Sequence, residues 1–351
     1  MSEEEAVGAV GEAELAQNAM RMLEMISGYW VTQILRATAE LSLADHVAAG
    51  AATPEEIAKR EGSDPRTTYR LLRAAASLGL FADAGDGRFS VTPMGGLLRK
   101  GAPGSLREMA MVQGAPFHWQ TWGALPDAVR KGGTQMQAAL GLAEGDTVFD
   151  YFGKHPEEGG LFAASMANAT GMVIDDVSAA VDLDGVSVAV DVGGSTGALV
   201  HTLMKTRPEL AGVVLDMPHV VDSAVQAAGE AGVLDRFTAV PGDFFEDVPA
   251  ADLYLLKMVL HDWDDAQCLT ILRNCRASAE PGARAVVVES VVDKVGEPGF
   301  GALLDINMLA ATHGQERDFA EFDALYAASG WQRVSTKPTR TPQFIQELVA
   351  V

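Results

Sequence analysis

The sequence predicts an α/β protein: a mostly parallel sheet with one reversed strand, preceded by an N-terminal domain of helices in a winged-helix arrangement. Three observations support this fold class. The apolar run Val188–Val192 ends in a glycine turn that opens a helix, and strand and helix patterns then alternate as far as Glu289. The last two strand patterns are joined by a short turn instead of a helix. We expect one domain at residues 1–104 and a second at 105–351.

The first domain begins with a helix pattern over Glu14–Ala39, one face of which carries apolar residues that include Met and Trp. Such a face is typical of a domain core or of a dimer interface, and the sequence leaves both open. A capping box with proline follows at Thr53–Glu56, then a helix from Asp64 to Leu78 and a hairpin over residues 80–92. Helix, turn, helix and hairpin together form a winged-helix arrangement.

A winged helix suggests DNA binding, but the charge of this domain disfavours it. Residues 1–104 hold ten Lys and Arg against fourteen Asp and Glu, and the whole chain has a net charge of −22. Because phosphate-binding modules are basic, we expect neither nucleic acid nor an anionic membrane as a partner. The first domain is instead predicted to be a dimerisation scaffold, which makes the protein a homodimer.

The composition indicates a globular protein of the cytoplasm. The 351 residues are 48% hydrophobic and 21% charged, which is ordinary for this class. No apolar run reaches the length of about 18 residues that a membrane-spanning helix needs. The acidic start, Ser2–Glu5, resembles neither a secretory nor a transit peptide. Cys268 and Cys275 lie seven residues apart in one predicted helix, and we expect both to be reduced thiols.

Residues 105–184 are predicted to be helical, and aromatic residues gather in this segment. They are Phe117, Trp119, Trp122, Phe149, Tyr151, Phe152 and Phe162. Some of them are expected in an ordinary core. A run of aromatic and Met residues between two domains is also typical of a pocket for a flat apolar molecule. We therefore expect this segment to line a substrate site.

Polar residues stand at the ends of the predicted strands, where parallel α/β sheets bind their ligands. The first strand gives Asp191 and the turn Gly193–Gly197, which lacks the glycine spacing of a dinucleotide site and so disfavours a nicotinamide dehydrogenase. A carboxylate ahead of this turn would repel a pyrophosphate and attract a cationic amino group. The later strands end at or near Asp216, Asp243, Lys257, His261 and Glu289.

These residues also have simpler interpretations. Asp216 could cap the following helix, Asp243 could belong to a turn, and Lys257 could be solvated. Polar residues at four strand ends together are less easily explained in this way, because the interior of a parallel sheet tolerates little polarity.

At this point the chain resembles a known family, the S-adenosylmethionine-dependent O-methyltransferases of the plant caffeate and flavonoid type with their bacterial natural-product relatives. The resemblance covers nearly the whole chain. The motifs that carry it are Asp191-Val192-Gly193-Gly194-Ser195-Thr196-Gly197, Leu215-Asp216-Met217-Pro218, Gly242-Asp243-Phe244-Phe245 and His261-Asp262-Trp263-Asp264-Asp265. It implies a Rossmann-like class I methyltransferase sheet and S-adenosyl-L-methionine as the cofactor.

The resemblance also implies roles for individual residues. Gly193 would lie against the methionine part of the cofactor, with Asp191 ahead of the same turn, and Asp216 would bind the ribose. Asp243, Phe244 and Lys257 would surround the adenine. His261 would be the general base, flanked by Glu289 and Glu316, and the substrate-lining positions would be Phe162, Met166 and Met308.

Two departures from the family pattern stand out. Ser195 occupies a position where many members have a third glycine, a change that we expect to be tolerated. The loop from Met308 to Glu316 is one residue shorter than in plant members, which leaves Glu316 less securely assigned than Glu289.

The implied reaction transfers the sulfonium methyl to a hydroxyl, expected to be phenolic, of an aromatic secondary metabolite of the antibiotic type. A phenol with a pKa of about 10 and an imidazole with a pKa of about 6.5 differ by roughly 5 kcal/mol in proton affinity. His261 must therefore be made more basic or act as the methyl moves. We expect Glu289, on the other ring nitrogen, to raise this basicity.

No metal is expected in this reaction, because the sequence shows no cluster of metal ligands. An alternative function lies within the same family, since some relatives use this cofactor site for hydroxylation, decarboxylation or ring closure. The presence of His261 favours methyl transfer.

Overall fold

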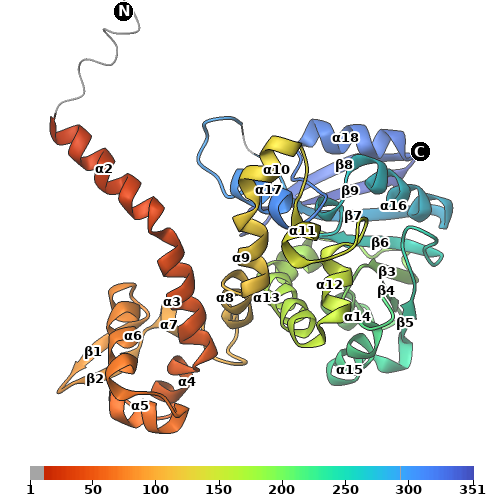
Figure 1. Ribbon diagram of the computed structural model, residues 1–351. Helices are drawn as coiled ribbons and strands as arrows, with labels where there is room; N and C mark the ends of the chain where they lie inside the picture. Colours follow the sequence, from red (N-terminus) through yellow and green to blue (C-terminus); the bar gives the residue numbers. More distant parts are fainter. Residues whose placement is uncertain (1–11, 293) are drawn as a thin grey trace, which may run out of the picture. The chain divides into compact units, whose positions relative to one another are not determined.

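The structure is a computed structural model that describes residues 12–292 and 294–351 (Figure 1). The chain divides into two compact units, one up to Ala115 and one from Pro116 to Val351. The division lies beyond residue 104 because α8 (Arg107–Gln113) packs on α3 (Gly28–Glu40). There the Gln33 and Arg36 side chains donate to the Gly114 carbonyl oxygen at 2.9 and 3.1 Å.

The first unit has the predicted winged-helix arrangement. Its other elements are α2 (Glu12–Ile26), α4 (Leu43–Ala48), α5 (Pro54–Glu61), α6 (Pro65–Ser77), β1 (Phe81–Gly85), β2 (Arg88–Val91) and α7 (Pro93–Gly96). The capping box at α5 is confirmed, since the Thr53 hydroxyl accepts from the Glu56 amide and the Glu56 carboxylate accepts from the Thr53 amide. The Asp64 carboxylate caps α6 by accepting from the Thr67 amide.

The apolar face of α2 and α3 stays uncovered within one chain. Leu15, Met22, Ile26 and Trp30 are each more than half exposed. From Leu15 to Trp30 this face therefore lies outside the core of the first unit, whereas Ile34, farther along α3, packs against that core. An apolar surface of this kind is typical of an interface with another protein chain.

The second unit starts with helices that cover the predicted segment 105–184 beyond Ala115. These are α9 (Pro116–Gly123), α10 (Leu125–Lys131), α11 (Met136–Leu140), α12 (Val148–Lys154) and α13 (Pro156–Ala180). Strands and helices then alternate: β3 (Val188–Val192), α14 (Ala198–Thr206), β4 (Ala211–Asp216), α15 (Val221–Ala231), η1 (Leu234–Arg236), β5 (Phe237–Pro241), β6 (Ala251–Lys257), η2 (Leu260–Asp262), α16 (Asp265–Ala277), β7 (Ala279–Ser290), α17 (Gly301–Ala311), α18 (Phe319–Ala328), β8 (Trp331–Pro338) and β9 (Gln343–Ala350).

The seven strands of this unit form one sheet in the order β5-β4-β3-β6-β7-β9-β8. All neighbouring pairs from β5 to β7 are parallel, whereas β9 runs antiparallel to both β7 and β8. The expected mostly parallel sheet with one reversed strand is confirmed. Because the order reverses direction at β3, ligands are expected beyond the carboxyl ends of β3 and its neighbours.

Helices cover both faces of the sheet (Figure 1). Val190 and Val192 of β3 pack in a core with α16 and α18, while Ala189 faces a second core with α13, α14 and α15. Cys268 and Cys275 are both buried free thiols of α16, as expected. No helix in the described part of the chain is long and apolar enough to cross a membrane.

Candidate active site at the carboxyl ends of the strands

The polar residues that the sequence singled out lie at one edge of the sheet. Asp216 ends β4 and pairs with Pro241 of β5, and Lys257 ends β6 and pairs with Val288 of β7. Glu289 follows directly in β7. Since these strands are parallel neighbours, their carboxyl ends meet at the same edge. The predicted gathering of these residues is confirmed, while their roles remain predictions.

The glycine turn after β3 is tied to the end of β4 by its backbone. The Gly193 amide donates to the Leu215 carbonyl at 2.8 Å, and the Ser195 amide donates to Asp216 Oδ2 at 2.8 Å. Gly193 has a φ of +65°, and a Cβ added there would lie 3.2 Å from Val259 and 3.6 Å from Phe244. Ser195 adopts a φ of +53°, a left-handed conformation that glycine adopts without strain.

Asp191 lies beneath this turn and is not open to an amino group in the way that the sequence suggested. It is 3% exposed, and its Oδ2 accepts from the Val200 amide in α14 at 3.4 Å. Burial raises its pKa to about 7, against the opposing effects of the Val200 amide and the Lys257 charge. The carboxyl therefore joins the turn to α14, and its predicted contact with the cofactor is untested.

Asp216 and Lys257 are half-buried, and Asp243 is exposed. Asp216 Oδ1 accepts from the Met217 amide at 2.7 Å, so each of its oxygens holds one backbone hydrogen and keeps a lone pair for a hydroxyl. Asp243 Oδ1 accepts from the Phe245 amide at 2.8 Å, which fits the turn interpretation as well. Burial lowers the pKa of Lys257, although the charges of Glu289 and Asp191 oppose this effect.

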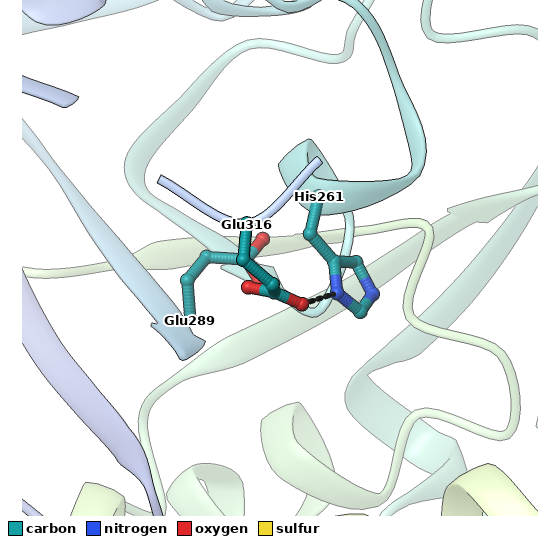
Figure 2. Close-up of side chains that lie close together, drawn as sticks. All are labelled: His261, Glu289 and Glu316. Carbon is teal, nitrogen blue, oxygen red and sulfur yellow. Dashed lines mark hydrogen bonds and ion pairs between the residues drawn. The ribbon is translucent and has the colours of Figure 1, made fainter. Parts of the chain in front are cut away.

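His261, Glu289 and Glu316 form a buried cluster beside this edge (Figure 2). His261 lies in η2, the short turn after β6, and is 5% exposed. Its Nδ1 lies 2.7 Å from Glu316 Oε1, the interaction drawn as a dashed line in Figure 2. Its Nε2 makes no hydrogen bond within residues 12–292 and 294–351 and lies 3.7 Å from Asp262 Oδ1.

The expectation that Glu289 bonds the second ring nitrogen is wrong. Glu289 Oε1 instead accepts from the backbone amides of Val259 and Leu260 at 3.0 and 2.8 Å. Glu289 therefore holds the turn that carries the histidine, and Glu316 holds the imidazole. The loop that carries Glu316 reaches His261 because Gly314 packs directly against the His261 and Asp262 backbone, where a Cβ would collide.

The surroundings of His261 favour its charged form. Burial alone lowers its pKa, but the carboxylates of Asp262 and Glu289 and the hydrogen bond with Glu316 outweigh burial and raise the pKa to about 10. Burial raises the pKa of Glu289, and it also raises that of Asp262 to about 6. In its neutral form, such an imidazole, with Nδ1 fixed by Glu316 and Nε2 free of hydrogen bonds among the described residues, is a strong base for a proton.

The expectation that no metal-ligand cluster exists also needs correction. Ligand atoms of His261, Glu289 and Glu316 all lie within 4.8 Å of one another, a spacing that could hold a metal ion. Protein hydrogen bonds already engage Nδ1 of His261 and one oxygen of each glutamate. This engagement favours a hydrogen-bonded cluster, and a reaction without metal remains a prediction.

The three predicted substrate-lining residues lie on two helices of the second unit. Phe162 and Met166 are half-buried on α13, and Met308 is 5% exposed on α17. Phe162 stacks on Phe152 with ring centroids 4.6 Å apart and contacts Phe149 edge-on at 6.3 Å. Phe149 in turn lies 5.9 Å from Trp263, two residues beyond His261. Aromatic contacts thus connect Phe162 to the turn that carries the histidine.

Sequence reasoning missed two residues at this site. Asp262 lay inside a quoted motif but had no role, although its carboxylate is the nearest to Nε2 of His261. Arg317 directly follows the predicted Glu316, and it is completely buried against the same turn. The signal that could have found Asp262 is its position next to the proposed base.

Comparison with known protein families identifies the family to which this chain belongs. A profile of the O-methyltransferase domain matches residues 122–332, more than half of the chain. The chain belongs to the O-methyltransferase family. A second profile, the O-methyltransferase dimerisation domain, matches residues 23–101, which agrees with the exposed apolar face of α2 and α3 and indicates a homodimer.

Individual relatives of this O-methyltransferase give the same result. It is 37% identical over 348 residues to phenazine O-methyltransferase PhzM of Lysobacter antibioticus, covering 99% of each chain. The crystal structure of LaPhzM superposes with a TM-score of 0.89 and 37% identity, covering 95% of this chain and 99% of that one. The structure of NcsB1, an O-methyltransferase from neocarzinostatin biosynthesis, has a TM-score of 0.76 and 30% identity, covering 92% and 96%.

NcsB1 was crystallised with S-adenosylmethionine and 2-hydroxy-5-methyl naphthoic acid. The O-methyltransferase described here uses S-adenosyl-L-methionine, and its relatives act on aromatic natural products. The edge residues fit such a cofactor. Asp216 has free lone pairs for hydroxyls, and at Gly193 the absence of a side chain leaves the space beside Phe244 and Val259 open.

Proposed function

We propose that this O-methyltransferase methylates a phenolic hydroxyl of a planar aromatic natural product in the cytoplasm, with His261 as the general base. The observation that carries the proposal is the His261 imidazole: it is buried, Glu316 binds its Nδ1, and its Nε2 has no hydrogen bond among the described residues. A base must offer a lone pair to the acceptor hydroxyl, and in the neutral imidazole that lone pair is on Nε2 because Glu316 keeps the proton on Nδ1.

The bound cofactor supplies a methyl group already activated by a positive sulfur, so the residues of this chain have two tasks: alignment and proton removal. Alignment of two reactants can lower the barrier by about 7–11 kcal/mol. For proton removal, the raised pKa of His261 narrows the gap of roughly 5 kcal/mol in proton affinity between phenol and ordinary imidazole, and the imidazole acts as a base only in its neutral form. Glu316 keeps the remaining proton on Nδ1, and Asp262 lies near enough to stabilise the imidazolium that forms.

We assign the cofactor to the edge formed by β3, β4, β5 and β6. Asp216 binds the ribose hydroxyls, and Gly193 and the buried Asp191 form the turn against the methionine part. Asp243, Phe244 and Lys257 surround the adenine. The Asp216→Ala variant should weaken cofactor binding, and calorimetry that shows normal affinity for S-adenosylhomocysteine would remove Asp216 from this assignment.

The acceptor class is inferred from the chain and its relatives together. Phe162, Met166 and Met308 give the site an apolar lining on the α13 and α17 side, where a flat ring system can pack. PhzM is named for phenazines, and NcsB1 binds a hydroxylated naphthoic acid. Both are fused aromatic systems, which supports a hydroxylated fused-ring acceptor here.

The test uses S-adenosylmethionine labelled at its methyl group and a panel of hydroxyphenazines and hydroxynaphthoic acids. We expect S-adenosylhomocysteine to form together with a methylated product. The His261→Ala variant should lose at least about 100-fold in kcat while its calorimetric affinity for S-adenosylhomocysteine is retained. The His46→Ala variant, in the other unit, is the control and should keep its activity.

Each outcome decides a separate point. Unchanged turnover of His261→Ala would remove His261 from the mechanism. Acceptor consumed without transfer of the label to product would instead favour the non-methylating chemistry of some family members.

A further inference from the structure

The backbone turn that carries His261 is held from two sides. On its amide side, Glu289 Oε1 accepts from Val259 and Leu260. On its carbonyl side, Arg317 Nη1 donates to the Leu260 oxygen at 3.0 Å and Nη2 donates to the Trp263 oxygen at 2.9 Å. A single 3-10 turn has few hydrogen bonds of its own, so side chains support its conformation. The Cys268 thiol also donates to the Leu260 and Trp263 oxygens, at 3.1 and 3.5 Å, but as a weak donor without charge.

Arg317 is an unusual residue to find in this place. It is 0% exposed, and a guanidinium remains charged at any ordinary pH, so its burial requires strong compensating bonds. Its Nε and Nη2 also donate to Asp265 Oδ1 at 3.0 and 2.8 Å, and the Asp265 side chain is 63% exposed. The Arg317 guanidinium therefore connects the partly exposed Asp265 carboxylate with the Leu260 and Trp263 carbonyls on either side of His261.

The backbone of Arg317 links the same parts of the site. Val291, two residues after Glu289, forms a parallel bridge with Arg317, and the Val292 amide donates to the Arg317 carbonyl at 3.1 Å. Glu316, its direct neighbour, binds the imidazole. One short segment thus holds both the side chain of His261 and the backbone on which that side chain is mounted.

We propose that Arg317 is a positioning residue for His261: by fixing the Leu260 and Trp263 carbonyls opposite Glu289, it keeps the imidazole against Glu316 with Nε2 directed to the acceptor. The proposal rests on the proposed role of His261 as the base. It predicts that the effect of Arg317 on turnover passes through His261.

The test is a double-mutant cycle of Arg317→Lys and His261→Ala, assayed at saturating S-adenosylmethionine with the best acceptor of the hydroxyphenazine and hydroxynaphthoic acid panel. Lysine keeps the charge but cannot bind both carbonyls and Asp265 in the planar geometry of a guanidinium. We expect Arg317→Lys to lower kcat about 10- to 100-fold in the wild-type background. In the His261→Ala background it should lower kcat less than about twofold, because there is no base left to position.

Arg236→Lys is the matched control. The Arg236 guanidinium also binds backbone carbonyls, those of Leu210 and Met204 at 2.8 and 2.7 Å. Arg236 directly precedes β5, the edge strand of the sheet, and makes no contact with the turn that carries His261 among the hydrogen bonds of the described residues. Its replacement should lower Tm without changing kcat. Should Arg317→Lys fail to fold, Asp265→Asn takes its place in the cycle. It removes the carboxylate charge that holds the Arg317 guanidinium, and it does so at a side chain that is largely exposed. We then expect Asp265→Asn to lower kcat about 2- to 5-fold in the wild-type background and to leave kcat unchanged in the His261→Ala background.

Equal losses in both backgrounds, or no loss in either, would overturn the positioning role. This failure is separate from that of the proposed function. If His261→Ala alone leaves turnover unchanged, the role of His261 as the base is wrong, whereas an impaired His261→Ala with a fully active Arg317→Lys contradicts the positioning role alone.

Discussion

Within residues 12–292 and 294–351, the O-methyltransferase contains two His–Glu pairs with the same contact distance and different surroundings. In the first unit, His46 Nε2 lies 2.7 Å from Glu61 Oε2, and the two side chains are 20% and 23% exposed. In the second unit, His261 Nδ1 also lies 2.7 Å from Glu316 Oε1, but the side chains are 6% and 0% exposed. A short contact alone therefore does not make a catalytic pair.

The difference lies in what surrounds each imidazole. The His261 turn is bonded by Glu289 and Arg317, and a third carboxylate, Asp262, lies 3.7 Å from Nε2. Water is largely excluded there, so each charge acts more strongly on the imidazole than it would at a surface. The His46 pair is partly solvated, and we expect it to serve only the packing of α4 against α5.

Breaking the backbone contact behind His261 should have the largest effect. In Gly314→Ala the new Cβ would collide with the His261 and Asp262 backbone, so the loop that carries Glu316 must move. We expect a fall of about 100-fold or more in kcat and a loss of about 1–3 kcal/mol in the free energy of unfolding. Gly171→Ala, at an exposed position of α13 with nothing within 4 Å of the new Cβ, is the control and should be neutral or slightly stabilising.

Exchanging the carboxylate for an amide in both pairs tests the comparison directly. Glu316→Gln keeps the size of the side chain but removes the charge, and its amide group can donate to Nδ1 and leave the proton on Nε2. We expect kcat to fall about 10- to 100-fold, since this is the wrong tautomer for a base. Glu61→Gln should change kcat less than about twofold. Similar effects of the two substitutions on steady-state kinetics would refute the distinction between the pairs.

The carboxylate of Asp262 should affect the pH at which the enzyme works. A base is active when neutral, so kcat/KM should rise with pH through the pKa of His261 in the free enzyme. Asp262 raises that pKa, so Asp262→Asn should move the inflection of the profile to lower pH. An inflection that stays in place, or one that moves upward, would show that Asp262 does not act on the imidazole.

The smallest effect is expected at the His46 pair. His46→Ala removes one partly exposed hydrogen-bonded contact between α4 and α5, so we expect a loss of about 1 kcal/mol or less in the free energy of unfolding. Thermal unfolding should show a small decrease in Tm with unchanged kcat. A large loss of activity would mean that the first unit contributes to the catalytic geometry.

The sequence predicted where the strand-end residues lie, because the carboxyl ends of parallel neighbouring strands meet at one edge of the sheet. This backbone arrangement does not depend on the direction of the side chains. It did not predict which glutamate binds the imidazole. Glu289 and Glu316 both lie near His261, and only the loop packed through Gly314 determines that Glu316 reaches Nδ1. Side-chain direction at the end of a strand depends on tertiary contacts that periodicity does not contain.

Arg317 shows the same limit more strongly. A charged residue in the polar motif Gly314-Gln315-Glu316-Arg317 would ordinarily be expected at the surface. It is buried because its principal partners are backbone carbonyls of a turn more than fifty residues away in sequence. Every residue has a backbone carbonyl, so the sequence does not show which carbonyls will need a side-chain donor in the folded protein.

The most direct test of the account compares wild type and His261→Ala on two acceptors of nearly the same shape whose hydroxyls differ in acidity, for instance a phenol and its ring-fluorinated analogue. For a phenol with a pKa of about 10, the ratio of kcat between wild type and variant should be at least about 100. For an analogue that is already ionised at the assay pH, no base is needed and the ratio should fall to near 1. An equally large ratio for both acceptors would contradict the claim that His261 removes the proton.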